Sequence, residues 1–303
     1  MKTNTMKKRS MILLVAAICV CVAVLCMLGV RAAHRPEKAE TKAGETVYSN
    51  DKAVVDASNL AEGYIFVKYT GPKNAPSKVR VTKDGGTTYT YTMKVPNENQ
   101  TFPLTEGSGK YTVQVYENTT GSKYAQIFSV TLDAKLRDEM LPYLYSNQYV
   151  NFKDDSEVVK KAKELTKDCK TDLECVQAIF AFVTENFTYD NAKAATVSSS
   201  YIPDPDAVLA AKKGICFDYS AVMAAMLRSQ GIPCKLVIGY AGDIYHAWIN
   251  VFIDNEGWVD QIIFFDGEHW SLMDPTFTSS AKHVANAKPY DTSTTKYSQK
   301  YAY

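Results

Sequence analysis

The sequence predicts an α+β fold made of two folded parts behind an N-terminal membrane segment. Residues 11–30 form an unbroken apolar run, and residues 60–132 alternate between apolar and polar side chains as β-strands do. Helical periodicity follows, and the segment 216–230 is apolar on nearly all sides before further strand-like stretches begin. A helix of that kind is buried. We therefore expect it to be the central helix of the second part, packed on an antiparallel sheet.

The N-terminal segment has the features of a membrane anchor. A short basic segment, residues 1–10, precedes the apolar run 11–30. Twenty helical residues span about 30 Å, the thickness of a bilayer core. Basic residues favour the cytoplasmic side, so we expect a single-pass membrane protein whose C-terminal domains are extracellular. The alternative is a signal peptide cleaved near Val30-Arg31-Ala32, which would make the protein secreted.

The next two segments are a linker and a small β-domain. Residues 31–58 are polar and poor in large apolar side chains, which is typical of a linker. Residues 59–133 contain short strand-like stretches separated by Gly, Pro and Asp turn signals, which predicts a small antiparallel β-sandwich. The strand-like stretches are 64–69, 79–81, 87–95, 111–116 and 124–132. Because this domain contains no histidine or cysteine, we expect it to act as a spacer or binding module.

Residues 134–303 carry several helix signals. Ser156 is a predicted cap for a helix over 157–167, and Thr171-Asp172-Leu173-Glu174 is a capping box that begins a second helix. Asp204 and Pro205 are suited to the first positions of a short third helix. We expect Gly214, which follows that helix, to adopt a left-handed conformation that directs the next helix.

Cys216, His246 and Asp274 are the candidate catalytic residues. Cys216 lies at the predicted N-terminus of the central helix, where free N–H groups and the helix dipole favour the thiolate and lower a thiol pKa from about 8.5. His246 lies in a predicted strand and Asp274 follows a later one. Cysteine, histidine and acid are the components of a nucleophile, its proton-transfer partner and the group that orients the imidazole.

The motifs around these residues, KGICFDYSA, YHAWI and MDPTF, resemble those of the transglutaminase-like superfamily of papain-type acyltransferases and peptidases. The resemblance covers roughly residues 154–277. It implies a papain-like domain, catalysis through a thioester on Cys216, and the catalytic triad Cys216, His246 and Asp274.

Two features depart from the family pattern. An extra piece, about 259–267, lengthens the chain between histidine and acid, so that Asp260 and Asp266 are rivals of Asp274. Asp274 is preferred because the Asp-Pro-Thr-Phe context matches. In addition, no glutamine lies within ten residues before Cys216, which leaves the Cys216 amide and an unidentified partner to bind an oxyanion. Tyr189 and Tyr219 are candidates, but packing is the expected role of both.

The function expected is that of a surface-exposed, cysteine-dependent enzyme acting on peptide, protein or cell-wall peptide amides. Transamidation needs an aromatic tunnel that excludes water. We expect Trp248 on the strand face away from His246, and Trp258 and Trp270 lie near turns. Hydrolysis is therefore favoured. The alternative is a non-catalytic binding or scaffolding module.

Cofactors and other partners are not indicated. The net charge of +1, with acids and bases interspersed, does not favour nucleic-acid binding. Neither CxxC spacing nor clustered histidines indicate a metal site. Whether Cys169 and Cys175 form a disulfide is left open, as is the oligomeric state.

Overall fold

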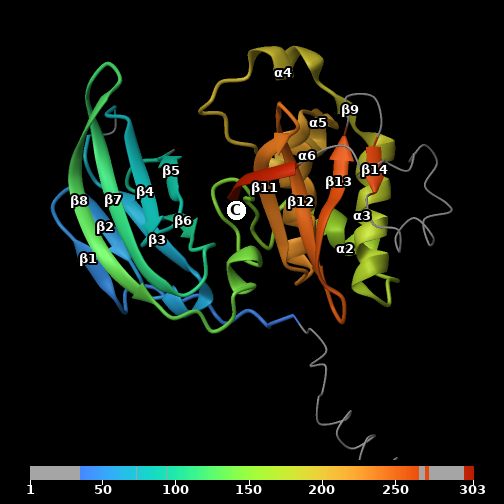
Figure 1. Ribbon diagram of the computed structural model, residues 1–303, viewed down its shortest axis with the longest axis horizontal. Helices are drawn as coiled ribbons and strands as arrows, with labels where there is room; N and C mark the ends of the chain where they lie inside the picture. Colours follow the sequence, from blue (N-terminus) through green and yellow to red (C-terminus); the bar gives the residue numbers. More distant parts are fainter. Residues whose placement is uncertain (1–34, 73, 94, 266–269, 273–296) are drawn as a thin grey trace, which may run out of the picture.

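The computed structural model describes a β-rich part and an α+β part that lie side by side (Figure 1). The described residues are 35–72, 74–93, 95–265, 270–272 and 297–303. The apolar run 11–30 lies outside them. Within the described residues, none of the helices has both the length and the apolar character needed to cross a bilayer.

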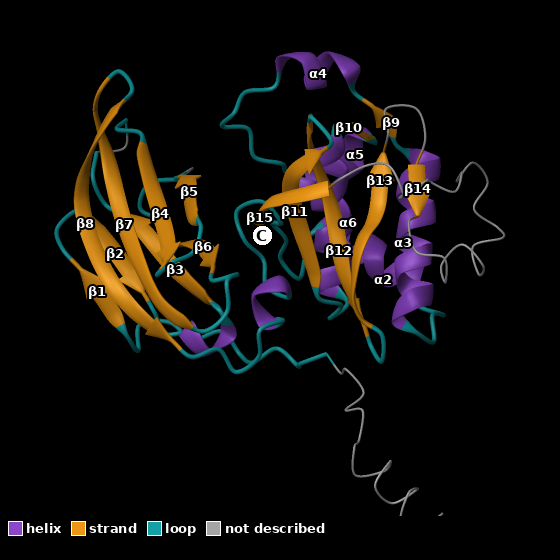
Figure 2. Cartoon of the chain, in the orientation of Figure 1, coloured by secondary structure: helices purple, strands orange, loops and turns teal. Residues whose placement is uncertain are grey.

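The first part is a sandwich of two antiparallel sheets (Figure 2). One sheet has the order β1-β2-β3-β6 and the other the order β5-β4-β7-β8. The strands are β1 (Val47–Ser49), β2 (Ala53–Asp56), β3 (Tyr64–Tyr69), β4 (Ser77–Lys83), β5 (Thr88–Thr92), β6 (Gln100–Pro103), β7 (Gly109–Thr120) and β8 (Lys123–Ala134). A 3-10 turn, η1 (Leu60–Glu62), precedes β3. The five strand-like stretches of the sequence correspond to β3, β4, β5, β7 and β8.

The sandwich begins earlier than the sequence predicts. β1 and β2 lie within residues 31–58, which were expected to be linker, and they pair from Val47↔Asp56 to Ser49↔Val54. Ala53 and Val55 are fully buried. These strands have only three and four residues, which is too short for an alternating pattern to stand out. The linker prediction is wrong for this stretch.

The second part packs helices against a five-stranded antiparallel sheet of order β14-β13-β12-β11-β15. Its helices are α2 (Glu157–Thr166), α3 (Asp172–Asn186), α4 (Asn191–Thr196), α5 (Pro205–Ala211) and α6 (Cys216–Ser229). Its strands are β9 (Thr188–Tyr189), β10 (Lys213–Gly214), β11 (Cys234–Ala241), β12 (Ile244–Ile253), β13 (Gly257–Phe265), β14 (Trp270–Leu272) and β15 (Tyr297–Ala302), and η2 (Leu141–Tyr143) lies in the connection between the two parts. α6 contacts β11, β12, α2, α3 and α5. Every residue from Asp218 to Arg228 is buried, so α6 is the central helix that the sequence predicts.

The local helix signals act in part as the sequence predicts. The Thr171 hydroxyl accepts a hydrogen bond from the Glu174 N–H at 3.2 Å, and the Asp204 carboxylate accepts one from the Ala207 N–H at 3.2 Å. The capping box is half formed, because the Glu174 carboxylate accepts the N–H of Lys170 and not that of Thr171. Ser156 lies at the N-cap of α2 but makes no side-chain capping bond.

The left-handed conformation predicted for Gly214 is wrong. The left-handed residue is Lys212, with φ of 48°, and Gly214 lies in β10.

Gly214 is required by space, since a Cβ atom there would lie 2.6 Å from the Cβ of Asp218. No flexible side-chain tip is involved in this contact. The close approach of β10 to the first turn of α6 therefore depends on the missing side chain.

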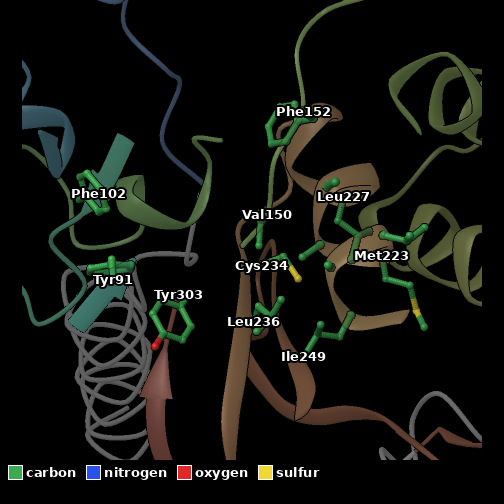
Figure 3. Close-up of a cluster of buried hydrophobic side chains, with 14 of the residues drawn as sticks. Tyr91, Phe102, Val150, Phe152, Met223, Leu227, Cys234, Leu236, Ile249 and Tyr303 are labelled. Atoms are coloured by element: carbon green, nitrogen blue, oxygen red, sulfur yellow. The ribbon is translucent and has the colours of Figure 1, made fainter. Parts of the chain in front are cut away.

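Tyr303, which follows β15, lies at the junction between the two parts (Figure 3). Its ring makes edge contacts with Tyr89 and Tyr91 of β5, at centroid distances of 5.5 and 5.9 Å, and with Tyr149 at 4.5 Å. β15 pairs with β11, so the strand that completes the sheet also carries the aromatic contact to the sandwich. Edge-to-face tyrosine pairs combine area burial with favourable ring electrostatics.

Arg228 ties the same junction to α6. It is fully buried, and its guanidinium donates to the carbonyl oxygens of Cys234 at 2.7 and 2.9 Å, Tyr145 at 2.8 Å and Tyr303 at 2.5 Å. A buried cation is tolerated when its donors are satisfied. These bonds link the end of α6, β11, the inter-domain connection and the residue after β15.

Candidate active site

The thiol of Cys216 lies at the first residue of α6 and is surrounded by hydrogen-bond donors. The Sγ atom accepts hydrogen bonds from the backbone N–H groups of Phe217 and Ala247 and from the hydroxyl of Tyr189. The first of these comes from the helix N-terminus, where backbone donors have no partner within the helix. The Ala247 donor comes from β12, and the Tyr189 donor from β9. Three separate elements thus converge on one sulfur atom.

The protonation state of this thiol differs from the expectation. The Cys216 pKa is raised above its ordinary value of 9.0, because burial disfavours the thiolate more than the three donors favour it, and the nearby Asp218 carboxylate adds to the increase. A helix N-terminus lowers a thiol pKa only where desolvation does not outweigh it. The expected low pKa is therefore wrong for this resting arrangement.

His246 is the third residue of β12, directly before the Ala247 whose N–H reaches the Cys216 sulfur. It pairs with Gly239 of β11 and is nearly buried, with 9% of its surface exposed. Burial lowers its pKa to about 4, so the imidazole is neutral at physiological pH. The fold thus brings the predicted nucleophile and the strand that carries the predicted base together across thirty residues of sequence.

The third predicted residue, Asp274, lies outside the described residues, as does Asp266. Asp260 lies on β13. Burial is the cause of the low His246 pKa, whereas a carboxylate beside the imidazole would raise it. The assignment of Asp274 as the orienting acid stays a prediction.

The predicted position of Trp248 is wrong. His246 and Trp248 are two positions apart on β12, and alternate residues of a strand point to the same face. The Trp248 ring is buried and packs against Tyr297 with a centroid distance of 5.6 Å. Its ring also approaches Gly239, where a Cβ would lie 2.9 Å from it. Trp248 is therefore buried on the face of the strand that also carries His246.

Tyr189 is hydrogen-bonded to both the backbone and the sulfur of Cys216, beyond the packing role expected of it. β9 and β10 pair in parallel with Tyr189 opposite Gly214, which brings its hydroxyl to the first residue of α6. The Tyr189 oxygen accepts a hydrogen bond from the Cys216 backbone N–H, and its O–H donates to the Cys216 sulfur. Its pKa is raised to about 12, chiefly by burial, so the hydroxyl remains a donor at neutral pH.

Tyr219 has the packing role that was expected of both tyrosines. It is buried, and its ring stacks on Tyr189 at a centroid distance of 6.4 Å and contacts Phe187 at 5.5 Å. In the sequence the two tyrosines look equivalent. The short parallel pairing of β9 with β10 distinguishes them, because it brings Tyr189 to Cys216. A strand of two residues is too short to be predicted from the sequence.

Other cysteines and acids supply no metal site in the part of the chain that the structure describes. No three His, Cys, Asp or Glu side chains come together there in a way that could hold an ion. Cys169 and Cys175 are free thiols in mutual contact, and burial together with that contact raises the Cys175 pKa to about 12. The question of a disulfide between them stays open.

The arrangement of a thiol at the N-terminus of a central helix beside a histidine-bearing strand agrees with a comparison of the sequence with family models. Residues 159–261, about a third of the chain, match the model of the transglutaminase-like superfamily. This segment is a transglutaminase-like domain. It contains Cys216 and His246 and ends before Asp274.

Two curated proteins are similar to part of this chain. The chain is 25% identical over 186 residues to the uncharacterized protein YebA of Bacillus subtilis (strain 168), covering 54% of this chain and 25% of YebA. It is 26% identical over 137 residues to the human kyphoscoliosis peptidase, covering 41% of this chain and 19% of that protein. The chain thus spans about a quarter or less of the length of either relative.

Two solved structures are similar over more of the chain. One is described as a "putative cysteine protease" from Cytophaga hutchinsonii, with a TM-score of 0.36, 16% identity and coverage of 65% of this chain and 68% of that one. The other is described as a "putative protease" from Parabacteroides distasonis, with a TM-score of 0.31, 14% identity and coverage of 69% and 62%.

Proposed function

We propose that the protein is a cysteine-dependent amide-bond enzyme that acts on peptide or protein substrates at the cell surface. The observation that carries the proposal is that the Cys216 sulfur accepts hydrogen bonds from the N–H of Ala247, the residue after His246, and from the hydroxyl of Tyr189. Acyl transfer through a thioester requires a thiol, a neutral imidazole and oxyanion donors. The proposed oxyanion donors are the Cys216 N–H and the Tyr189 hydroxyl.

The proposed reaction begins with attack of the Cys216 sulfur on the amide carbonyl carbon. The thiol proton passes to the His246 imidazole, and the carbonyl oxygen becomes an oxyanion. This oxygen would take two hydrogen bonds that are used differently in the resting state. One is that of the Cys216 N–H, which the Tyr189 oxygen accepts at rest, and the other is that of the Tyr189 hydroxyl, which donates to the Cys216 sulfur at rest. The imidazolium then protonates the departing amine as the C–N bond breaks, which leaves a thioester on Cys216.

The second half of the reaction returns the enzyme to its starting state. Neutral His246 takes a proton from a water molecule, whose oxygen attacks the thioester carbonyl. The C–S bond breaks, the sulfur regains a proton from His246, and a carboxylic acid leaves. In this proposal Asp274 orients the imidazole and raises its basicity.

Water is the preferred acceptor in this proposal. Two of the three tryptophans that could wall a tunnel for an amine are engaged elsewhere. Trp248 is buried against Tyr297, and Trp258 packs on Tyr143 at 5.3 Å and under the Lys235 ammonium at 3.8 Å. Transamidation requires that an amine reach the thioester while water is excluded. Packed side chains of this kind do not favour such a tunnel, so we infer hydrolysis.

The test uses an activated ester, because the natural amide is unidentified. The full-length protein is mixed with p-nitrophenyl acetate, nitrophenolate release is followed, and the acylated peptide is identified by mass spectrometry. We expect a burst and acetyl-Cys216. Cys216→Ala should abolish the burst and His246→Ala should nearly do so. Tyr189→Phe should slow it by about 10²- to 10³-fold, the usual effect of losing one oxyanion donor.

The outcomes separate the proposal from its alternative. If Cys216→Ala retains the burst, or if acetylation occurs on other residues only, the protein is better explained as a non-catalytic binding module. Asp274→Asn should reduce the rate less than His246→Ala, and a larger loss from Asp260→Asn or Asp266→Asn would show that a different acid is used. A glutamine peptide with excess primary amine then distinguishes free acid from amine conjugate.

The proposed location rests on residues 1–30 of the sequence. Protease added to intact cells should degrade both folded parts, and detergent should be needed to extract the full-length chain. A mature form in the medium that begins near Ala33 would instead establish secretion after cleavage.

A further inference from the structure

Asp218 is a fully buried carboxylate two residues after the cysteine. Its Oδ2 atom accepts the N–H of Ile215, the residue that precedes α6, at 2.8 Å, and it accepts the Lys193 ammonium at 2.7 Å. Its other oxygen accepts the Tyr201 hydroxyl. The first of these bonds caps the helix whose first residue is Cys216. The carboxylate therefore fixes the turn on which the thiol is carried.

The two side-chain partners of Asp218 come from an exposed segment, residues 191–204. This segment contains α4 and the loop that leads to α5, and it arches over the end of the sheet in Figure 1. Residues 191–200 are exposed except for the half-buried Lys193. The Lys193 ammonium also donates to the Tyr201 hydroxyl at 2.7 Å and lies 4.1 Å from the centre of its ring. Lys193 and Tyr201 thus connect this largely exposed segment to the buried carboxylate.

A buried anion at this position creates an electrostatic problem for the nucleophile. Asp218 is one of the groups that oppose ionisation of Cys216, and little solvent is available to screen it. The titratable groups that face Asp218 are Lys193 of α4, Tyr201 of the following loop, Tyr189 of β9, and Cys216 and Tyr219 of α6. Lys193 is the cation in this set. A second pair, Lys213 with Asp190 at 3.5 Å, lies on the neighbouring β9–β10 connection.

We propose that Asp218 is a positioning residue for the Cys216 nucleophile, and that Lys193 is the counter-charge that keeps this buried carboxylate from suppressing the reactivity of the thiol. The proposal takes Cys216 as the nucleophile from the proposed function. It divides the work of Asp218 in two: a hydrogen bond to Ile215 N–H, which an asparagine oxygen can also accept, and a negative charge, which Lys193 must balance. The largely exposed segment 191–204 then controls the reactivity of the Cys216 thiol through the charge of Lys193, without direct contact with the sulfur.

The test measures alkylation of Cys216 by iodoacetamide in the full-length protein, read at the peptide level by mass spectrometry from pH 6 to pH 10.5. Lys193→Met should move the alkylation midpoint up by about one pH unit and slow the reaction about tenfold at pH 8. Lys193→Arg, which keeps the charge, should behave as the wild type does. Lys213→Met removes a nearby lysine that does not contact Asp218 and serves as the matched control.

The double variant separates charge from packing. Asp218→Asn alone should not slow alkylation, and Lys193→Met combined with Asp218→Asn should recover the rate lost in Lys193→Met. Two results would overturn the proposal: a Lys193→Met rate within twofold of the Lys213→Met rate, or a Lys193→Arg loss as large as that of Lys193→Met.

Alkylation needs no turnover, so the acyl burst remains an independent measurement. If alkylation of Cys216 depends on Lys193 but no acyl burst occurs, the enzymatic function is refuted and this inference still holds.

Discussion

The protonation state of the resting site gives a prediction that can be worked out from the structure. The Cys216 pKa is raised above 9.0 and the His246 pKa is lowered to about 4, both chiefly by burial. The His246 shift from 6.5 to about 4 by itself adds about 3 kcal/mol to the cost of moving the proton from sulfur to imidazole, at 1.36 kcal/mol per pKa unit. The raised Cys216 pKa adds to that cost. The resting pair at pH 7 should therefore be a neutral thiol and a neutral imidazole.

Iodoacetamide alkylation tests this state directly. The rate constant for Cys216 should rise about tenfold per pH unit from pH 7 to pH 9, because only the thiolate reacts. His246→Gln should leave the rate at pH 7 within about twofold, since the neutral imidazole carries no charge that stabilises the thiolate. A rate plateau that extends below pH 6 and disappears in His246→Gln would refute this reasoning, since it would reveal a thiolate–imidazolium pair.

Three further predictions concern stability. The pKa of His246 is about 4 in the fold and near 6.5 when unfolded, so the unfolded chain binds the extra proton between these values. The free energy of unfolding should therefore fall by up to about 3 kcal/mol as the pH drops from 6.5 to 4. Urea unfolding of His246→Gln should lack this part of the loss. A variant with the same pH dependence as the wild type would contradict the prediction. Tyr303→Ala removes a ring that is 4% exposed and should lower the free energy of unfolding in urea by about 3–5 kcal/mol. Its control, Tyr240→Ala, changes a residue that is 39% exposed and should cost less than about 1 kcal/mol. Similar costs for the two variants would show that the junction is not a packed core. Gly214→Ala forces a Cβ to 2.6 Å from Asp218 and should destabilise the protein by about 1–3 kcal/mol; a stabilising effect would mean that β10 can move away freely.

The placement of Tyr189 and Lys193 suggests how one domain serves both stability and chemistry. The Tyr189 hydroxyl is hydrogen-bonded to both the amide and the sulfur of Cys216, and the two-residue parallel pairing of β9 with β10 positions it there. Lys193 follows four residues later and reaches the carboxylate that caps the same helix. The short segment after α3 thus supplies both a proposed oxyanion donor and a proposed counter-charge. Changes in this segment should alter reactivity more than they alter the fold.

Much of the second domain could be predicted because its signals are local. The caps at Thr171 and Asp204 depend on residues three positions away, and each side chain accepts the backbone N–H that the sequence predicts. The all-round apolar character of 216–230 predicts a buried helix, and α6 is buried from Asp218 to Arg228. Cys216 and His246 could be named as candidate catalytic residues because each lies in a short motif that is read directly from the sequence, and the two motifs follow one another in the expected chain order.

Other features were decided by tertiary structure alone. β15 comes from residues 297–302 and pairs with β11, which lies some sixty residues earlier. The residues near β15 in the sequence do not indicate which strand it pairs with. The role of Gly214 depends on the proximity of Asp218 to its backbone, and the role of Tyr189 depends on the pairing of β9 with β10.

The pKa of Cys216 shows the same division. The sequence by itself determined that the thiol lies at a helix N-terminus, a local feature that lowers a thiol pKa. Only the assembled fold decided how deeply the sulfur is buried, and that burial raises the pKa. Hydrogen bonds of a helix end are set by neighbours along the chain, whereas desolvation is set by every element that packs around the site.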